Sequence, residues 1–597
     1  MQSNVLFIQV DQMHADALSI AEHPYVKTPN LDRLAQTGIR FTQCYSQSPV
    51  CLPSRVCFLS GQYEKTHRQY GFVGSQDSDM PLLSKHFKDN GYTTAFFGKQ
   101  HTGSIRPDWA VDRCSPSLWE DQDRAKPAGS WYGDYLKRNN QAFPTPEVHG
   151  AEYIGKPVGE GVPQGSHPTR KMAGETKMPL EHNLENWTTQ ECLTYLDQQW
   201  TRDEPFFIWL SYDRPHYPTA LPKEWYDQIK PEKITLDAIL SAQELQKKPG
   251  WVAQTYINSP SRLTMGDDAM RHVLATYFTL IDLIDQQIGR VLDWLDEQNL
   301  TDQTHIVFSA DHGDHAGDLG AFDKRLGVAS NAIIRIPLIW HPAADSLDDS
   351  CIGTVLNAPV ESIDLFPTLC DLCNLPIPET VDGQSITAAF KGEELPVDRA
   401  VFSEQYWHKA VIHNGWKFVH HVQKQVGELY DLTNDPTERN NRFSDPDCQS
   451  RVEELKHLLI RFLAGDYALS DVGQNQIMHT HLHQRNKWRT WDVAGEDELP
   501  NVIDGGSTWF VQQGTMQLFY DLHAQEHYIY DIKTDPDKLE NILNTAAGQK
   551  VFGPLRDALI HRLSTRIAAI DNIDARTRNP EQYTLAQIEE QLAAARH

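Results

Sequence analysis

The stretch Ser48-Pro49-Val50-Cys51-Leu52-Pro53-Ser54-Arg55 places a single cysteine at the predicted start of a helix. Pro53 favours the first turn of a helix, because its fixed φ suits that turn and its missing N–H is not needed there. Cys51 would then lie at the positive end of the helix dipole, where thiolates, phosphate and sulfate are stabilised. Arg55 follows one turn later and faces the same side. The stretch therefore predicts a site for an anion.

Apolar segments that end in polar residues recur along the chain, which is typical of the strands of an α/β sheet. The segment 4–10 is rich in branched apolar residues, as expected of a buried parallel strand. Segments 92–97, 205–212 and 304–310 have the same character. The polar residues that follow these four segments are Asp11 with Gln12, Lys99 with His101, His216, and Asp311 with His312. Because parallel strands of an open sheet bind ligands at their carboxyl ends, we expect these groups to converge on one edge.

Each of these groups also has an ordinary interpretation. Taken alone, Lys99 is typical of a solvated lysine and His101 of a loop histidine. If every group had such an ordinary role, all four predicted strands would end in polar residues by coincidence. Lys324, which follows Asp311 and precedes a further predicted strand at 336–340, extends the same set. The combination favours a catalytic or binding site.

Helical patterns alternate with these strands. Thr28 and Gly38 are typical of the two ends of a helix, and 275–295 has the apolar spacing of a long helix lying on a sheet. The fold class we expect is therefore α/β, a sheet sandwiched by helices. A chain of 597 residues exceeds what one core usually supports. Because antiparallel strand patterns take over near 395, we predict a catalytic domain over 1–395 and a smaller C-terminal α+β subdomain over 396–597.

Three stretches carry further expectations. Residues 104–184 are rich in Pro, Gly and aromatic residues and have little periodicity. Since loops this long are usually functional, we expect an insertion that shapes the substrate pocket, the alternative being a packed surface excursion. In the C-terminal part, a strand-strand-helix pattern at 411–463 recurs at 519–570, which predicts a duplicated unit. The helical segment 585–594 is a candidate contact element for an oligomer.

Composition excludes several classes of partner. The net charge of -27 argues against nucleic acid, because binding to phosphate backbones needs clustered Lys and Arg. No apolar run is long enough to span a membrane. Nine cysteines leave at least one unpaired, which favours a reducing compartment. The segment 1–4 carries no basic residue and leads directly into the first strand, unlike a signal peptide. These features predict a cytoplasmic protein.

The pattern Cys51-x-Pro53-Ser54-Arg55, followed by Leu59-Ser60-Gly61, resembles the signature of the type I sulfatases of the alkaline phosphatase superfamily. The segment Gly98-Lys99-x-His101, the pair Pro215-His216, and Asp311-His312-Gly313 with its following Lys324 are also similar to sulfatase segments. The resemblance spans roughly residues 4 to 432. It implies an alkaline-phosphatase-like fold.

The resemblance also implies a chemistry. In this family a maturation enzyme oxidises the motif cysteine, here Cys51, to formylglycine, whose hydrate attacks the sulfur of a sulfate ester. Loss of the sulfate then regenerates the aldehyde, with His101 removing a proton and Asp311 as a candidate base for the attack. The residues implied to hold the divalent metal are Asp11, Gln12, Cys51, Asp311 and His312. Those implied to neutralise the sulfate oxygens and the departing alcohol are Arg55, Lys99, His216 and Lys324.

The metal pairs depart from the common sulfatase pattern. Many sulfatases have Asp-Asp and then Asp-Asn or Asp-Gln, whereas this chain has Asp11-Gln12 and Asp311-His312. The variant is similar to choline sulfatases and phosphonate monoester hydrolases. Oxygen ligands favour Ca²⁺, and a histidine ligand makes Mn²⁺ a competitor. The intact Lys99-x-His101, in contrast, resembles a sulfatase.

The function we expect is hydrolysis of a sulfate ester on a small molecule or a carbohydrate, such as a sulfated sugar or choline sulfate. The first alternative is a phosphonate monoester or phosphodiester hydrolase that uses the same site. A second alternative, of another class, is a non-catalytic protein that retains the anion pocket.

Overall fold

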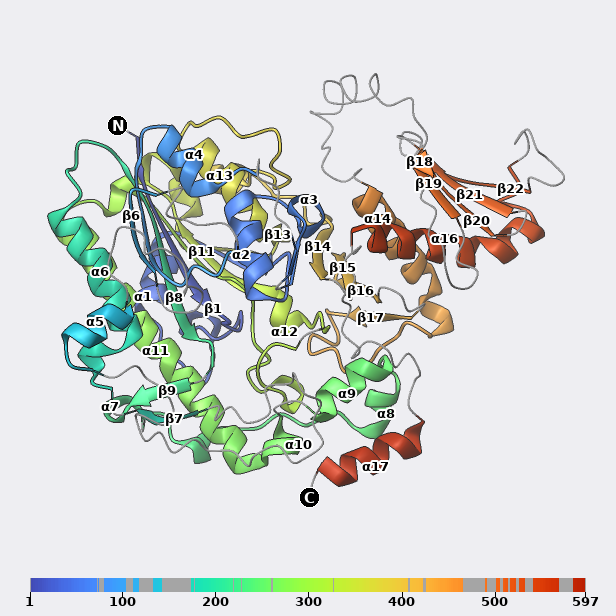
Figure 1. Ribbon diagram of the computed structural model, residues 1–597, viewed down its shortest axis with the longest axis horizontal. Coiled ribbons are helices and arrows are strands. Elements are labelled where there is room, and N and C mark those ends of the chain that lie inside the picture. Colours follow the sequence, from blue (N-terminus) through green and yellow to red (C-terminus); the bar gives the residue numbers. More distant parts are fainter. Residues whose placement is uncertain are drawn as a thin grey trace.

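The computed structural model describes residues 2–595. Excepted are 72, 75–79, 104–110, 117–131, 142–172, 177, 218, 227, 259–260, 326, 406–407, 422–425, 465–488, 491–500, 505–507, 514–515, 522–525, 532–540 and 568–583. A nine-stranded mixed sheet forms the centre of the molecule (Figure 1). This sheet confirms the predicted α/β class.

Four parallel strands form the middle of this sheet. They are β10 (Thr304–Ala310), β1 (Asn4–Asp11), β8 (Phe206–Pro215) and β5 (Thr93–Gly98), in that spatial order. Their burial on both faces explains the nearly continuous apolar runs in the sequence. The remaining strands are β6 (Arg113–Pro116) beyond β5, and β11 (Arg335–His341), β2 (Ile39–Tyr45), β12 (Thr354–Leu356) and β13 (Val360–Glu361) on the other side.

Helices cover both faces of the sheet. On one face lie α11 (Asp267–Glu297), α6 (Leu184–Gln198) and α1 (Pro29–Thr37), with α11 running the length of the domain (Figure 1). The other face is covered by α2 (Cys51–Ser60), α4 (Leu83–Asp89) and α13 (Leu365–Leu372). One large apolar core fills the space between these layers and includes the cysteines Cys370 and Cys373.

Shorter elements complete this part of the chain. Among the described residues, β6, α5 (Tyr132–Arg138) and β7 (Ala173–Thr176) lie inside the predicted insertion. β6 adds a parallel strand to the main sheet, while most of 104–184 lies outside the described residues. The short elements are α3 (Glu64–His67), β3 (Gln69–Tyr70), β4 (Val73–Gly74), α5 (Tyr132–Arg138), β7 (Ala173–Thr176), β9 (Thr219–Pro222), α7 (Lys223–Tyr226), α8 (Ala242–Gln246), α9 (Gly250–Asn258), α10 (Arg262–Met265) and α12 (Asn331–Ile334).

The C-terminal part begins with a four-stranded antiparallel sheet and a helix. The strands are β14 (Val401–Gln405), β15 (His408–His413), β16 (Trp416–His421) and β17 (Gly427–Asp431), and the helix is α14 (Gln449–Ala464). One face of this sheet packs on the catalytic part, where Val401 and Ala410 meet Tyr45 and Ile334. The other face packs on α14. The sheet therefore lies between the catalytic part and the rest of the C-terminal part.

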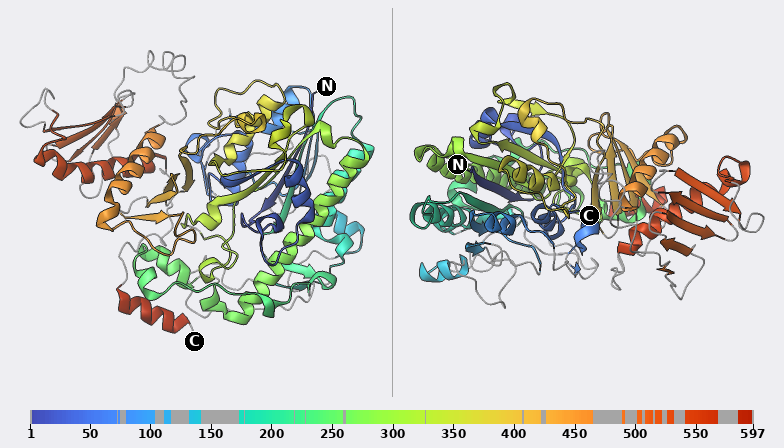
Figure 2. Two further views of the ribbon diagram at one scale, coloured as in Figure 1. Left: turned by 180° about the vertical axis from the view of Figure 1, so that it is seen from behind. Right: turned by 90° about the horizontal axis from the view of Figure 1, so that it is seen from above.

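A second sheet and helix follow the first. The strands are β18 (Arg489–Thr490), β19 (Asn501–Asp504), β20 (Thr508–Gln513), β21 (Met516–Asp521) and β22 (Glu526–Asp531), and the helix is α16 (Ala546–Ile567). Leu518, Ile529 and Leu555 share a core with α14. Figure 2 shows the two small sheets following one another away from the main sheet.

The last helix returns to the catalytic part. α17 (Leu585–Ala595) packs on α8 and α9, and its Ile588 and Leu592 enter their apolar core. None of the helices in the described part of the chain has both the length and the apolar character that crossing a membrane requires.

Candidate active site

The four parallel strands bring their carboxyl ends to one edge of the main sheet. Val10 is in register with Ala310 on one side and with Tyr212 on the other, and Gly98 is in register with Ser211. The polar residues that follow these positions in sequence therefore lie at one edge. The predicted parallel arrangement of the strand ends is confirmed.

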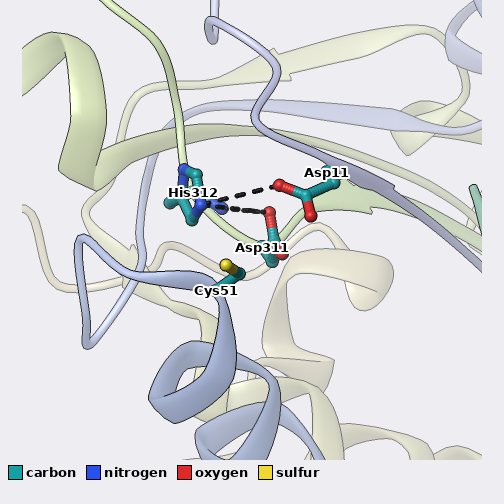
Figure 3. Close-up of side chains that lie close together, drawn as sticks. All are labelled: Asp11, Cys51, Asp311 and His312. Carbon is teal, nitrogen blue, oxygen red and sulfur yellow. Dashed lines mark hydrogen bonds and ion pairs between the residues drawn. The ribbon is translucent and has the colours of Figure 1, made fainter. Parts of the chain in front are cut away.

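A compact set of potential metal ligands lies at this edge (Figure 3). One ligand atom from each of Asp11, Cys51, Asp311 and His312 lies within 4.8 Å of the ligand atoms of the other three, and all four residues are buried. Among the described residues, Asp11 Oδ1 and His312 Nε2 have no hydrogen-bond partner; they lie 3.6 Å apart. Two carboxylates, an imidazole and the sulfur position of Cys51 form a ligand set that suits a divalent cation, and two of these ligand atoms are free to bind it.

Helix α2 delivers Cys51 to this set. The helix begins at Cys51, as predicted, after the extended residue Val50. The hydroxyl groups of Ser46 and Ser54 both donate to the backbone carbonyl of Asp311, at 2.7 and 2.5 Å. These two bonds fix the start of α2 against the end of β10, which explains why a helix and a strand far apart in sequence meet here.

The guanidinium group of Arg55 is engaged by neighbouring protein groups. Its Nε donates to Asp311 Oδ2 at 2.7 Å, and its Nη1 donates to the Lys99 carbonyl and to Ser211 Oγ, both at 2.8 Å. The side chain is fully buried. Arg55 thus connects α2 with β8 and with the residues that directly follow β10 and β5.

Opposite charges compensate one another within the set. Lys99 forms an ion pair with Asp11 Oδ2. Burial by itself would raise the pKa of Asp11, but Lys99 and other positive groups outweigh burial and hold that pKa well below its usual value. Burial likewise favours a high pKa for Cys51, and Lys324 and Lys99 overcome it to lower the pKa of the thiol. The position of Cys51 is therefore one that favours negative charge.

A second cation approaches from the loop after β10. Lys324 Nζ donates to Gln12 Oε1 at 2.9 Å and lies 2.9 Å from His216 Nε2. Burial, and then the charge of Lys324, hold the pKa of His216 well below its usual value. His216 is therefore a neutral imidazole beside a charged ammonium group in this structure.

The side chain of Gln12, the remaining predicted metal ligand, is engaged in hydrogen bonds with other residues. Its amide Nε2 donates to Asp314 Oδ2 at 2.6 Å and to Asp323 Oδ1 at 2.9 Å, while its oxygen accepts from Lys324. The side chain thus holds Lys324 in place.

His101 lies two residues beyond Lys99, after the end of β5. It is half-buried and has a left-handed backbone, with φ of 47°. It therefore lies at the same edge of the sheet as the ligand set.

Sequence reasoning missed the residues that support the site. Asp314, Asp323 and Ser211 hold Gln12 and Arg55, and the Tyr277 hydroxyl donates to the Gln12 carbonyl at 2.8 Å. Asp314 follows Asp311 and His312 closely in sequence, and Asp323 directly precedes Lys324. Their closeness in sequence to predicted site residues could have identified them. Ser211 and Tyr277 carried no such signal, because they lie inside a strand and a helix.

Comparisons with known proteins place this chain in a family. The sulfatase family model matches residues 3–375, and a model described as N-sulphoglucosamine sulphohydrolase, C-terminal, matches residues 317–464. An arylsulfatase of Clostridium perfringens is 27% identical over 78% of this chain and 95% of its own length. An N-acetylglucosamine-6-O-sulfatase of Bacteroides thetaiotaomicron is 25% identical over 76% of this chain and 85% of its own.

The fold has a close counterpart among solved structures. The phosphonate monoester hydrolase SpPMH from Silicibacter pomeroyi superposes with a TM-score of 0.64 at 24% identity, covering 77% of this chain and 95% of its own. This likeness shows the alkaline-phosphatase-like fold. Because the sulfatase model matches more than half of the chain, the chain belongs to the sulfatase family, the sulfuric ester hydrolases.

Proposed function

We propose that this protein hydrolyses a sulfate ester, giving the alcohol and sulfate, with Cys51 as the residue that is converted to formylglycine. The observation that carries the proposal is the position of Cys51, whose sulfur lies within 4.8 Å of ligand atoms on Asp11, Asp311 and His312. In the mature protein the formylglycine hydrate supplies the attacking hydroxyl group. The oxidising partner would be a maturation enzyme that acts before Cys51 is buried.

The divalent metal would be held by Asp11, Cys51, Asp311 and His312. A bound cation polarises sulfate oxygens and lowers the pKa of a nearby hydroxyl group. We propose Ca²⁺ with Mn²⁺ as the competitor, because two carboxylates suit a hard cation and the imidazole suits a softer one. Gln12 could bind the metal only if its amide rotated, because the amide oxygen accepts a hydrogen bond from Lys324.

Lys99 and Lys324 are the groups we propose to neutralise charge on the sulfate. Lys99 pairs with Asp11 of the ligand set, and the half-buried Lys324 contacts Gln12. Cations fixed in advance stabilise developing charge in a transition state. His216 Nδ1 lies 2.6 Å from the Tyr217 carbonyl, which can only accept, so its Nε2 is the acceptor that faces Lys324. We propose that His216 holds Lys324 in place for the sulfate. Arg55 acts as a positioning residue, since its contacts orient Asp311.

His101 is the residue we propose for removing a proton as sulfate leaves. Asp311 is less suited to act as a base. Its Oδ1 accepts hydrogen bonds from the backbone N–H groups of Gln12 and His312, at 3.1 and 2.8 Å, and its Oδ2 accepts from Arg55. A carboxylate with both oxygens engaged is held as a ligand.

The maturation state of Cys51 provides a direct test. We expect the peptide that contains Cys51 to carry the mass of the aldehyde when the protein is co-expressed with a maturation enzyme. Cys51→Ala should retain the fold and abolish sulfate ester hydrolysis, because the nucleophile is missing. A protein that keeps an unmodified thiol and full activity would contradict the proposal, and a protein with no activity in either form would be the non-catalytic anion binder.

We also propose that the substrate is a sulfated sugar or another small sulfate ester and that the protein functions in a reducing compartment, the cytoplasm. All nine cysteines are buried and none of them forms a disulfide bond, as is usual where thiols stay reduced. Detection of the protein in the soluble cytoplasmic fraction of its cell would support the location. Recovery from the medium or the periplasm with intact activity would contradict it.

A further inference from the structure

Two buried polar side chains at the end of the β14–β15 hairpin have groups that the described residues leave unsatisfied. Gln405 and His408 are direct partners in the β14–β15 ladder, and both are fully buried. Within the described part of the chain, Nε2 of Gln405 and both ring nitrogens of His408 have no hydrogen-bond partner. A buried polar group without a partner destabilises the folded protein. Three such atoms side by side therefore need an explanation.

The hairpin end lies beside the loop that carries Lys324. The backbone N–H of Gly327 donates to Oε1 of Gln405 at 3.3 Å. Gly327 comes three residues after Lys324, and three residues of extended chain span at most about 11 Å. Lys324 in turn contacts both Gln12 and His216. Gln405 therefore contacts the loop that carries Lys324.

A network on the same face of the sheet supports His408. Its cross-strand neighbour is His421, at 6.3 Å between ring centroids. His421 Nε2 lies 2.8 Å from Glu428 Oε1, and the ring of Trp251 packs edge-on against it at 4.6 Å. The Glu428 carboxylate also accepts from the Tyr430 hydroxyl group. This arrangement orients the His421 ring and leaves both nitrogens of His408 available.

The unsatisfied atoms define the chemistry of a suitable ligand. Burial, and then the nearby His421, hold the pKa of His408 well below its usual value. A neutral imidazole carries one donor and one acceptor, and the Gln405 amide adds a further donor. Hydroxyl groups match this combination because each can donate and accept. A quaternary ammonium group offers neither a donor nor an acceptor.

We propose that Gln405 and His408 bind hydroxyl groups of the alcohol that carries the sulfate and so select a sulfated sugar over choline sulfate. This inference rests on the proposed function, because it assumes that the sulfate group is held beside Lys324. It assigns part of the substrate choice to the C-terminal sheet, in addition to the insertion at 104–184.

The test compares substrates with and without hydroxyl groups on the full-length matured protein. The sugar substrate is the best-cleaved member of a panel of monosaccharide sulfates of glucose, galactose and N-acetylglucosamine, and the reference is nitrophenyl sulfate. Gln405→Met and His408→Phe retain size but remove the hydrogen-bonding groups. We expect each to lower the ratio of kcat/KM for sugar to kcat/KM for nitrophenyl sulfate at least tenfold, mainly through a higher KM for the sugar.

A matched control comes from the other end of the same strand. His413 also lies on β15 but pairs with Glu454 at 3.1 Å, so His413→Phe should leave both substrates unaffected. Equal losses on the two substrates in Gln405→Met and His408→Phe, or an unchanged ratio, would overturn the inference. A wild-type preference for choline sulfate over every sugar sulfate would do the same. Failure of the wild type to cleave any sulfate ester would instead contradict the proposed function.

Discussion

At the scale of single residues, the site is a set of buried charges that compensate one another. Asp11 and Asp311 face Lys99 and Arg55, and each of these ion pairs is buried. Removing one partner of such a pair leaves a buried charge uncompensated, which is costly. Cations that contact no buried carboxylate directly are therefore the better targets for separating catalysis from stability.

Lys324→Ala is the substitution that makes this separation. Lys324 bonds to the amide of Gln12 and lies beside His216, so its loss orphans no carboxylate within hydrogen-bond distance. We expect kcat/KM for sulfate esters to fall about 10²–10³-fold, with a small change in thermal stability. Lys65→Ala is the control, because Lys65 is a lysine that packs on Phe462, away from the site. If Lys324→Ala were as active as Lys65→Ala, Lys324 would have no role in the site.

Metal binding should stabilise the fold measurably. Asp11 Oδ1 and His312 Nε2 gain a partner when a cation binds, and a ligand at a hundred times its Kd stabilises a protein by about 2.7 kcal/mol. Titration of chelator-treated protein with Ca²⁺ or Mn²⁺ should therefore raise its Tm, and His312→Ala should weaken the response. A Tm that neither cation changes would be inconsistent with a metal site here.

The residue scale also shows what the sequence could predict of the site. Asp11, Cys51, Asp311 and His312 were expected to lie together because their motifs resemble those of sulfatases, and the structure brings them together. The contacts of Gln12 were not predictable, because they depend on Asp314 and Asp323 in a loop far along the chain. A motif specifies residue types, whereas the rotamer of a buried amide depends on its tertiary neighbours.

At the scale of elements, helix α11 holds the start of α1 through buried carboxylates. Asp285 accepts hydrogen bonds from the backbone N–H groups of Asn30, at 3.1 Å, and Leu31, at 2.9 Å. These bonds satisfy the unpaired donors at the N-terminus of α1. Burial nevertheless raises the pKa of Asp285 to about 6 and that of Asp282, on the same helix, to about 7.

These raised values predict a pH dependence of stability. Because the folded pKa of Asp285 exceeds the unfolded value, folding takes up a proton, and stability is lost as pH rises through about 4 to 6. Two pKa units correspond to roughly 3 kcal/mol at most. Asp285→Asn, whose amide resembles the protonated acid, should flatten this part of the curve in denaturant unfolding at pH 4 to 7. If unfolding free energy depended on pH equally in Asp285→Asn and the wild type, Asp285 would not be the titrating group.

The two small sheets repeat one design, and we infer that they are duplicated units. Asn441 Oδ1 accepts hydrogen bonds from the backbone N–H groups of Leu429 and Phe443. Asn541 Oδ1 accepts from those of Ile529 and Leu543 in the same way. In both units the asparagine fixes the segment between the last strand and the helix.

If the units are duplicated, the two asparagines have the same structural role, and we expect their contributions to folding stability to differ because their burial differs. Leaving a buried N–H unpaired costs about 1–3 kcal/mol, so Asn441→Ala should clearly destabilise the protein. Asn541 is exposed, and water can replace its bonds, so Asn541→Ala should cost less. Unfolding by denaturant would measure both, with Asn440→Ala as the control. An unchanged stability in Asn441→Ala would contradict the shared role.

The elements also divide into those that sequence could predict and those it could not. The four central strands and α11 were predicted because their apolar runs are long and regular. The helix start at Cys51 was predicted from Pro53. The strand β6 was missed because its four residues carry no apolar alternation and gain their place only by pairing with β5.

At the scale of the whole molecule, an acidic protein concentrates positive charge where it binds an anion. The chain carries a net charge of -27, yet Lys99, Lys324 and Arg55 surround the position of Cys51. The C-terminal sheet packs directly on the catalytic part and contacts the Lys324 loop through Gln405. The subdomain is therefore a part of the site's surroundings.

The central claim is that this site acts on sulfate esters. Its most direct test is the hydrolysis of a matched sulfate ester and phosphonate monoester of one aryl alcohol by the matured protein, with Cys51→Ala as the control. The account predicts faster cleavage of the sulfate ester and loss of that activity in Cys51→Ala. A preference for the phosphonate ester would contradict it and would mean that Gln12 and His312 mark a phosphonate monoester hydrolase.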